Sequence, residues 1–238
     1  MVCLGPPTDM FPATLFDFNG VLVDDESVHL AAFRDVLAPL GITLSDEAYV
    51  DRYLGFDDRG AFQALLEDNG RSPGDAEIER LITAKRPLYL ARARTDLPTF
   101  PGAAAAIRRR AAHGPVVIVS GALRDEIVLG LEVLGVSELV EHIVSADDTR
   151  AGKPDPEGYL LGLEYLRSRI GAGASRALVI EDSLAGIDAA RAAHLACAAV
   201  AHTYPGAELA ARGADLVVER IDELGDDLLL ETYRRLHG

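Results

Sequence analysis

The sequence has only two cysteines, no tryptophan and no long apolar run in its 238 residues. Cys3 and Cys197 are far apart and form no CxxC pair, so they provide no disulfide framework, which is typical of a reducing cytoplasm. The longest apolar stretches are far shorter than the ~20 residues that cross a bilayer. No basic segment leads into an apolar run near the first residue. We therefore expect a cytoplasmic protein without a signal peptide or a membrane partner.

Positive charge is also scarce, since 23 Lys and Arg residues face 38 Asp and Glu residues, for a net charge of −15. Such a field repels nucleic acid and anionic membranes, so neither is expected as a partner, and an anionic substrate needs a locally positive pocket. Lys85 and Lys153 are the only lysines. In a chain that otherwise uses arginine, they indicate a need for a compact ammonium group. Chance survival of two lysines under a codon bias is the alternative.

Short apolar runs with β-branched residues alternate with stretches of helical periodicity. This pattern predicts an α/β fold with a Rossmann-like parallel sheet covered by helices on both faces. The expected strands are 13–18, 115–120, 141–145, 177–181, 197–201 and 215–219. The expected helices are 102–112, 123–134, 156–169, 184–193 and 220–236.

The segment 26–98 shows only helical patterns. Ser45 is a suitable helix start, and Gly41, Gly55 and Gly70 are suitable helix ends. We predict an α/β core domain built from residues 1–25 and 99–238, interrupted by a helical domain over 26–98. The linkers are expected at 23–27 and 95–102, the second one stiffened by two prolines.

Polar side chains follow four of the predicted strands. They are Asp17 and Asn19, then Ser120 and Gly121, then the loop from Ser145 to Lys153, and finally Glu181, Asp182 and Ser183. Ligands bind at the carboxyl ends of the strands in parallel sheets of this kind, so these residues are expected to form one site. Burial of a carboxylate at the end of an apolar run costs free energy, so Asp17 is expected to have a function and is a candidate nucleophile.

Asn19 and Gly20 admit a purely structural interpretation. An Asn-Gly pair between two apolar runs is the strongest short-range signal for a two-residue β-hairpin, because both residues tolerate a positive φ angle. A tight turn and a functional site can coexist at this position.

Four segments, in this order, resemble motifs of the haloacid dehalogenase superfamily, specifically its phosphatase and β-phosphoglucomutase-like group with a helical cap. They read DFNGVLVDDE, VSGALRDEI, AGKPDPEGY and IEDSLAGIDAARAA, and the resemblance extends from about residue 15 to 218. It implies a haloacid dehalogenase-like core in which residues 26–98 are the cap.

The resemblance also implies a role for each strand-end residue. Asp17 is expected to be the nucleophile, Lys153 to neutralise charge and hold Asp17, and Ser120 and Gly121 to bind the phosphoryl oxygens. Mg²⁺ is expected as the cofactor, since it prefers a few hard oxygen ligands. The implied ligands are Asp17, the backbone carbonyl of Asn19, and Asp182, with Glu181 as an outer or alternate ligand. For the last motif a simple helix cap by Ser183 or Asp182 is the alternative, and the two roles are compatible.

Within the cap, the resemblance places Lys85 where family members use a lysine that reaches toward the substrate. His29 and Arg52 are further candidates for substrate or phosphate binding, and Asp58 and Arg59 could also face the pocket when the cap closes. Solvated helix faces are the alternative for the arginine and acidic residues of the cap. The implied function is a Mg²⁺-dependent phosphoric monoester hydrolase that acts on a small phosphorylated metabolite through an aspartyl-phosphate. We expect a monomer or a weak homodimer. The alternatives are a β-phosphoglucomutase-like sugar-phosphate mutase and a noncatalytic protein that binds phosphorylated metabolites.

Asn19 departs from the family pattern, which places a second aspartate there to exchange protons with the leaving group and the water. An amide cannot exchange a proton at working pH, and general acid/base help is worth roughly 10²- to 10⁴-fold in rate. Turnover is therefore expected to survive best on activated phosphates. The alternatives at this position are a replacement group among Asp24, Asp25, His29 and Asp58, a binding protein without turnover, deamidation of Asn19, and a deliberately introduced change.

His194 is a smaller departure, because the family places glycine after this helix. Histidine tolerates the left-handed conformation of a C-terminal cap better than bulky residues do, so only a local adjustment is expected. The remaining histidines outside the insert show no ligand spacing and are expected to be structural or surface residues: His113, His142, His202 and His237.

Overall fold

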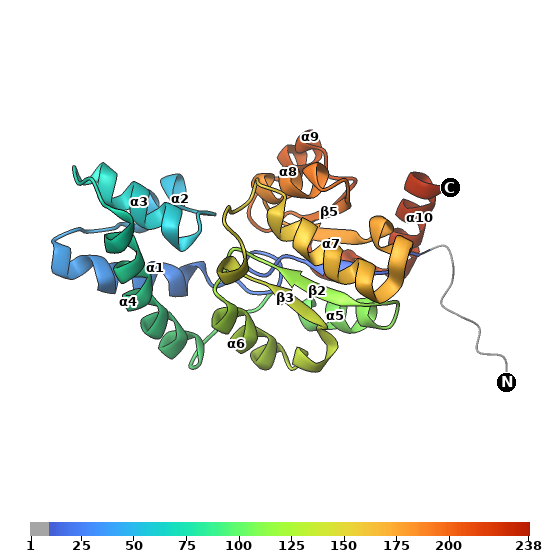
Figure 1. Ribbon diagram of the computed structural model, residues 1–238, viewed down its shortest axis with the longest axis horizontal. Helices are drawn as coiled ribbons and strands as arrows, with labels where there is room; N and C mark the ends of the chain where they lie inside the picture. The colour runs from blue at the N-terminus through green and yellow to red at the C-terminus, as the bar shows by residue number, and fades with distance from the viewer. Residues whose placement is uncertain (1–9) are drawn as a thin grey trace. The chain divides into compact units, whose positions relative to one another are not determined.

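The computed structural model describes residues 10–238, which form two compact units (Figure 1). The described residues up to Val23 combine with Thr99–Gly238 into an α/β unit, and Asp24–Pro98 form a helical unit. Cys3 lies outside the described residues. None of the described helices combines the length and the apolar character needed to cross a membrane.

A six-stranded parallel sheet forms the centre of the α/β unit, as predicted. Its strands are β1 (Thr14–Phe16), β2 (Val116–Val119), β3 (His142–Val144), β4 (Leu178–Glu181), β5 (Ala196–Val200) and β6 (Leu216–Val218). Their order is β3-β2-β1-β4-β5-β6, so the order changes direction at β1. A ligand site is expected outside the carboxyl ends at such a switch point, here at the ends of β1, β2 and β4.

Six α-helices accompany these strands among the described residues. They are α5 (Ala103–Ala111), α6 (Arg124–Leu134), α7 (Glu157–Ile170), α8 (Leu184–Ala192), α9 (Gly206–Arg212) and α10 (Asp226–His237). Side chains of α7, α8 and α9 share one apolar cluster with Leu15, Val117 and Val179 of the sheet. Figure 1 shows α7 and α5 on opposite sides of the sheet, so both faces are covered.

One predicted helix was wrong, and one helix was not predicted. The single helix expected over 220–236 is a 3₁₀ turn at Ile221–Glu223 followed by α10, because Gly225 stands between them in an extended conformation. Helix α9 was not predicted, because its seven residues are too few for a clear apolar period.

The helical unit contains α1 (Glu26–Leu37), α2 (Asp46–Arg52), α3 (Asp58–Asp68) and α4 (Asp75–Ala93). The Ser45 side chain caps α2 as predicted, since its Oγ accepts from the Ala48 amide at 3.1 Å. Gly41, Gly55 and Gly70 all have a positive φ angle, which confirms their role in ending the helical segments. Apolar side chains of the helices pack into a core of their own.

Asn19 and Gly20 form a tight turn without the two strands of a hairpin. Gly20 has a φ of 73°, and the Phe18 carbonyl accepts from the amides of Leu22 at 2.8 Å and Val23 at 3.2 Å. The hairpin interpretation is wrong because the chain folds back on Phe18 at once, and the bridge from Asn19 to Val23 is parallel. The Asn-Gly signal thus identified the turn but not its type.

His194 adopts the predicted left-handed conformation, with a φ of 58°. Its amide donates to the Arg191 carbonyl at 3.0 Å, so helix α8 ends normally without the glycine.

Candidate active site

Three carboxylates meet at the carboxyl ends of the neighbouring strands β1 and β4. Asp17 directly follows β1, and its amide donates to the Ile180 carbonyl at 2.9 Å. Glu181 ends β4 and Asp182 follows it. One oxygen of each carboxylate lies within 4.8 Å of the others, and the exposed fractions are 8% for Asp17, 0% for Glu181 and 4% for Asp182. Burial of three acids so close together requires compensating charge.

Lys153 provides that charge. Its Nζ lies 2.7 Å from Asp17 Oδ1 and 2.6 Å from Glu181 Oε1. Tyr159 donates its hydroxyl to the same Glu181 oxygen at 2.7 Å, and Ser183 Oγ donates to Glu181 Oε2 at 3.0 Å. The ammonium therefore bridges the ends of two strands that are distant in the sequence.

The electrostatics of the cluster follow from burial. Burial, together with the Glu181 charge, raises the pKa of Asp17 to about 6 although Lys153 opposes the shift. Burial also raises the pKa of Asp182 well above its usual range, with the charges of Glu181 and Asp17 adding to the effect. Burial alone would raise the pKa of Glu181 and lower the pKa of Lys153, because it disfavours both charges. Their ion pair has the larger effect, so the pKa of Glu181 is lowered and the pKa of Lys153 is raised. Both raised values show that negative charge on Asp17 and Asp182 is unfavourable in this cluster, and a cation beside them would relieve that cost.

Two glycines leave room for these carboxylates. A Cβ atom on Gly20 would lie 2.0 Å from Asp182 Oδ2, and one on Gly186 would lie 1.9 Å from Glu181 Oε1. Any side chain at either position would displace a carboxylate, which explains glycine in both sequence motifs.

The cluster fits a divalent cation. Its donors are hard carboxylate oxygens, and the charge of one lysine does not balance three acids. Mg²⁺ is commonly bound by one or two carboxylates and keeps several waters, so Asp17 and Asp182 suffice as side-chain ligands. Glu181 is engaged with Lys153, Tyr159 and Ser183, which suits a supporting position beside the ion.

Ser120 lies beside residue 19 at the end of β2. Its Oγ donates to Asn19 Oδ1 at 3.3 Å and accepts from the Ala122 amide at 3.1 Å. Gly121 follows as an exposed residue before α6. The structure thus brings Ser120 and Asn19 together at the edge that also carries Asp17.

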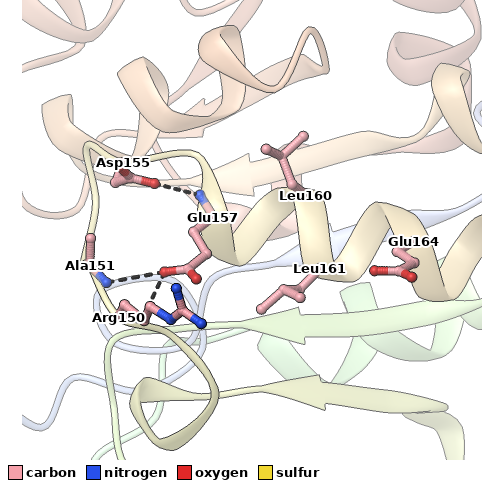
Figure 2. Close-up of a pocket in the computed structure, with 7 residues that line it drawn as sticks. All are labelled: Arg150, Ala151, Asp155, Glu157, Leu160, Leu161 and Glu164. Atoms are coloured by element: carbon pink, nitrogen blue, oxygen red, sulfur yellow. Dashed lines mark hydrogen bonds between the residues drawn. The ribbon is translucent and has the colours of Figure 1, made fainter.

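The loop that carries Lys153 is organised by Glu157, at the first turn of α7. Figure 2 shows the Glu157 carboxylate turned toward the backbone of the loop, where Oε2 accepts from the amides of Arg150 at 2.7 Å and Ala151 at 3.1 Å. The Asp155 carboxylate in turn accepts from the Glu157 amide at 2.9 Å. These bonds hold the loop against the helix on which Tyr159 stands.

Replacement of Glu157 by Ala is expected to lower kcat, because the loop loses two charge-assisted bonds and Lys153 is less well positioned. A displacement of about 1 Å can cost roughly 100-fold in rate, which sets the upper limit of the effect. The matched control is Glu164→Ala, which removes a carboxylate from the same surface pocket without touching the loop. Phosphate-release kinetics of both variants measure the difference, and equal rates would show that Glu157 does not position Lys153.

The predicted residues Lys85, His29 and Arg52 contact other residues of the helical unit. Lys85 is fully buried, and its Nζ contacts Asp58 Oδ1 and lies 2.7 Å from His29 Nδ1. His29 Nε2 lies 3.1 Å from Asp25 Oδ2. Arg52 instead forms a surface pair with Asp68, with Nη2 at 2.6 Å from Oδ1.

Three of the four groups considered as replacements for the missing acid/base lie around Lys85. Asp25, His29 and Asp58 belong to one network around Lys85, and the Tyr89 hydroxyl donates to Asp25. If one of these groups gained or lost a proton, the charges and hydrogen bonds of its neighbours in the network would change as well.

Three side chains at the site were not predicted: Tyr159, His202 and Thr203. Tyr159 lies inside a recognised motif, but nothing in its spacing distinguishes it from a core residue. His202 and Thr203 follow β5, and Thr203 donates its hydroxyl to Asp182 Oδ2. The rule that ligands bind at the carboxyl ends of strands could have indicated this fifth strand end.

Several known proteins are similar to this chain over most of its length. Residues 11–194 match the family model described as haloacid dehalogenase-like hydrolase. The chain is 31% identical over 223 residues to the SUPPRESSOR OF QUENCHING 1 protein of Arabidopsis thaliana, covering 91% of this chain but 20% of that protein. It is 28% identical over 219 residues to validoxylamine A 7'-phosphate phosphatase of Streptomyces hygroscopicus subsp. limoneus, covering 90% and 96%.

The solved structures confirm the fold. The crystal structure of CbbY from Rhodobacter sphaeroides in complex with phosphate matches with a TM-score of 0.80 and 26% identity, covering 93% of this chain and 100% of that chain. The resemblance inferred from the four sequence motifs is therefore confirmed, and the chain belongs to the haloacid dehalogenase-like hydrolase family.

Proposed function

We propose that this protein is a Mg²⁺-dependent phosphatase that hydrolyses a small phosphorylated metabolite through an aspartyl-phosphate on Asp17. The observation that carries the proposal is the ammonium of Lys153 between Asp17 and Glu181, with Asp182 beside them at the switch point of the sheet. A relative named as a phosphatase and a related structure that contains phosphate support the same class of substrate.

Each residue of the site has a separate role in the proposed reaction. An Oδ of Asp17 attacks phosphorus while the bond to the leaving oxygen breaks, and water then attacks the acyl phosphate to release phosphate and restore the carboxylate. Lys153 orients Asp17 and neutralises charge on the transferring group, while the Ser120 hydroxyl donates to a phosphoryl oxygen. Mg²⁺ held by Asp17, Asp182 and the Asn19 carbonyl would supply charge that offsets the repulsion between two anions.

Asn19 sets the range of substrates in this proposal. Its amide can hold a substrate oxygen by hydrogen bonding but cannot protonate a poor leaving group. Acyl and aryl phosphates need little or no such help, so they are expected to be hydrolysed faster than sugar monophosphates.

Phosphate release from a panel of acyl, aryl and sugar phosphates, with Mg²⁺ or with EDTA, tests the proposal. Turnover that requires Mg²⁺ and favours good leaving groups supports it. Binding of phosphorylated compounds without release of phosphate would instead favour the noncatalytic alternative.

Mg²⁺ is expected to stabilise the folded protein, because it binds the native carboxylate cluster and not the unfolded chain. An ion at 100 times its Kd contributes about 2.7 kcal/mol. The folded-state pKa of Asp17 is raised to about 6, so protons compete with the ion below that value, and the stabilisation should shrink from about pH 7 to about pH 5. Thermal unfolding with and without Mg²⁺ at both pH values measures this.

Two variants control the measurement. Asp182→Asn is expected to abolish the response to Mg²⁺, whereas Asp188→Asn, the same change at the surface pair with Arg212, is expected to preserve it. If Mg²⁺ did not change the unfolding temperature of the parent protein, the assignment of the cluster as a Mg²⁺ site would be contradicted.

A further inference from the structure

The loop after β5 brings two side chains to the candidate active site. Strand β5 pairs in parallel with β4, with Glu181 opposite Ala199, so the chain leaves β5 at the edge where the carboxylates lie. His202 and Thr203 follow within three residues of the end of the strand, and both are partly buried. The two side chains act on neighbouring parts of the same site.

Thr203 contacts the Asp182 carboxylate. Its Oγ1 donates a hydrogen bond to Asp182 Oδ2. The same oxygen faces the backbone of Gly20, because a Cβ atom on that glycine would lie 2.0 Å from it. The carboxylate is therefore confined between a hydroxyl donor and the turn after β1, and rotation about its side-chain bonds is restricted.

His202 contacts the backbone of the same turn after β1. Its Nδ1 lies 2.8 Å from the Gly20 carbonyl, and because a carbonyl oxygen only accepts, Nδ1 is the protonated nitrogen in this contact. The ring stacks on Phe100 with centroids 3.9 Å apart and planes 15° apart. The turn that carries the Asn19 carbonyl is thereby attached to the loop that carries Thr203.

We propose that Thr203 is a positioning residue for the cation: its hydroxyl holds the Asp182 carboxylate in the orientation that binds Mg²⁺ and so determines the affinity for the ion. This inference rests on the proposed function, because it takes the carboxylate cluster to be a Mg²⁺ site. His202 supports the same geometry by holding Gly20 in place. Loss of an outer partner of this kind typically lowers metal affinity by about 10- to 100-fold.

The test is a calorimetric titration of Mg²⁺ into the full-length parent protein and three variants. Thr203→Val keeps the shape of the side chain but loses the donor, and a 10- to 100-fold rise in the Kd for Mg²⁺ is expected. Thr203→Ser keeps the hydroxyl and is expected to restore the Kd of the parent. The control is Thr232→Val, which removes a buried hydroxyl that donates to the Leu228 carbonyl within α10. Circular dichroism without Mg²⁺ verifies that each variant is folded.

The outcomes separate this inference from the proposed function. A parent that binds Mg²⁺ while Thr203→Val binds it equally well would refute the positioning role and leave the phosphatase proposal intact. A serine variant as weak as the valine variant would also refute it, because the hydroxyl would not be the cause. A parent that binds no Mg²⁺ would overturn the Mg²⁺-dependent phosphatase itself, and this inference with it.

Discussion

Replacement of Asp17 by Asn is expected to abolish phosphate release, lowering kcat by at least about 1,000-fold. The amide lacks the anionic oxygen that attacks phosphorus, and no acyl phosphate can form at residue 17. Two measurements check this: steady-state phosphate release, and mass spectrometry of peptides from acid-quenched protein, which should carry phosphate on Asp17 in the parent only.

The variant is expected to remain folded. Since burial raises the folded-state pKa of Asp17 to about 6, the folded protein binds this proton more tightly than the unfolded chain. Stability from this group is therefore present at low pH and is lost as the pH rises toward 6. At neutral pH a neutral amide removes a destabilising charge, and its oxygen can still accept from Lys153.

The matched control is Asp188→Asn, a partly buried position outside the cluster that pairs with Arg212. Its kcat should equal that of the parent. Phosphate release by Asp17→Asn at the rate of the parent would refute the assignment of the nucleophile.

Replacement of Asn19 by Asp is expected to raise kcat on sugar monophosphates by roughly 100- to 10,000-fold. The new carboxyl can protonate the leaving oxygen and then take a proton from the attacking water. It can also accept from Ser120 as Asn19 does at 3.3 Å, so the local geometry is retained. The gain on an aryl phosphate should be much smaller, because that leaving group departs without a proton.

A matched pair of an alkyl and an aryl phosphate measures the effect in both proteins. The control is Asn69→Asp, the same change at the end of α3. Peptide maps must show intact Asn19 in the parent, since Asn-Gly pairs deamidate. Equal rates of parent and variant on the alkyl phosphate would show that another group already exchanges the proton. Asp24 and the acidic and histidine side chains around Lys85 would then be the candidates for that group.

Much of the fold could be predicted because its signals are local. Each strand of the sheet coincides with a short apolar run that contains β-branched residues, and Ser45 and Ser183 cap helices as their sequence context indicates. The errors occurred where local signals are weak. Helix α9 is seven residues long, and the last helical stretch is divided by Gly225, a residue compatible with several conformations.

The side-chain partners of the site were less predictable. The motifs indicated that Asp17, Lys153 and Asp182 belong together, but not that Lys153 contacts Glu181 as closely as Asp17. Thr203 has no local signal at all, because its hydroxyl meets a carboxylate 21 residues away only when β4 and β5 are paired.

The sequence by itself determined the parallel α/β core, the helical insert, the family, and the strand ends that carry the carboxylates and the lysine. Periodicity and motif order are local properties of the chain, and they suffice for these conclusions. Only the tertiary structure decided that Lys85 is buried against Asp58 and His29, and that Thr203 and Gly20 confine Asp182. Contacts of this kind depend on how distant segments approach one another, because the partner of a buried charge is selected by packing rather than by neighbours in the sequence.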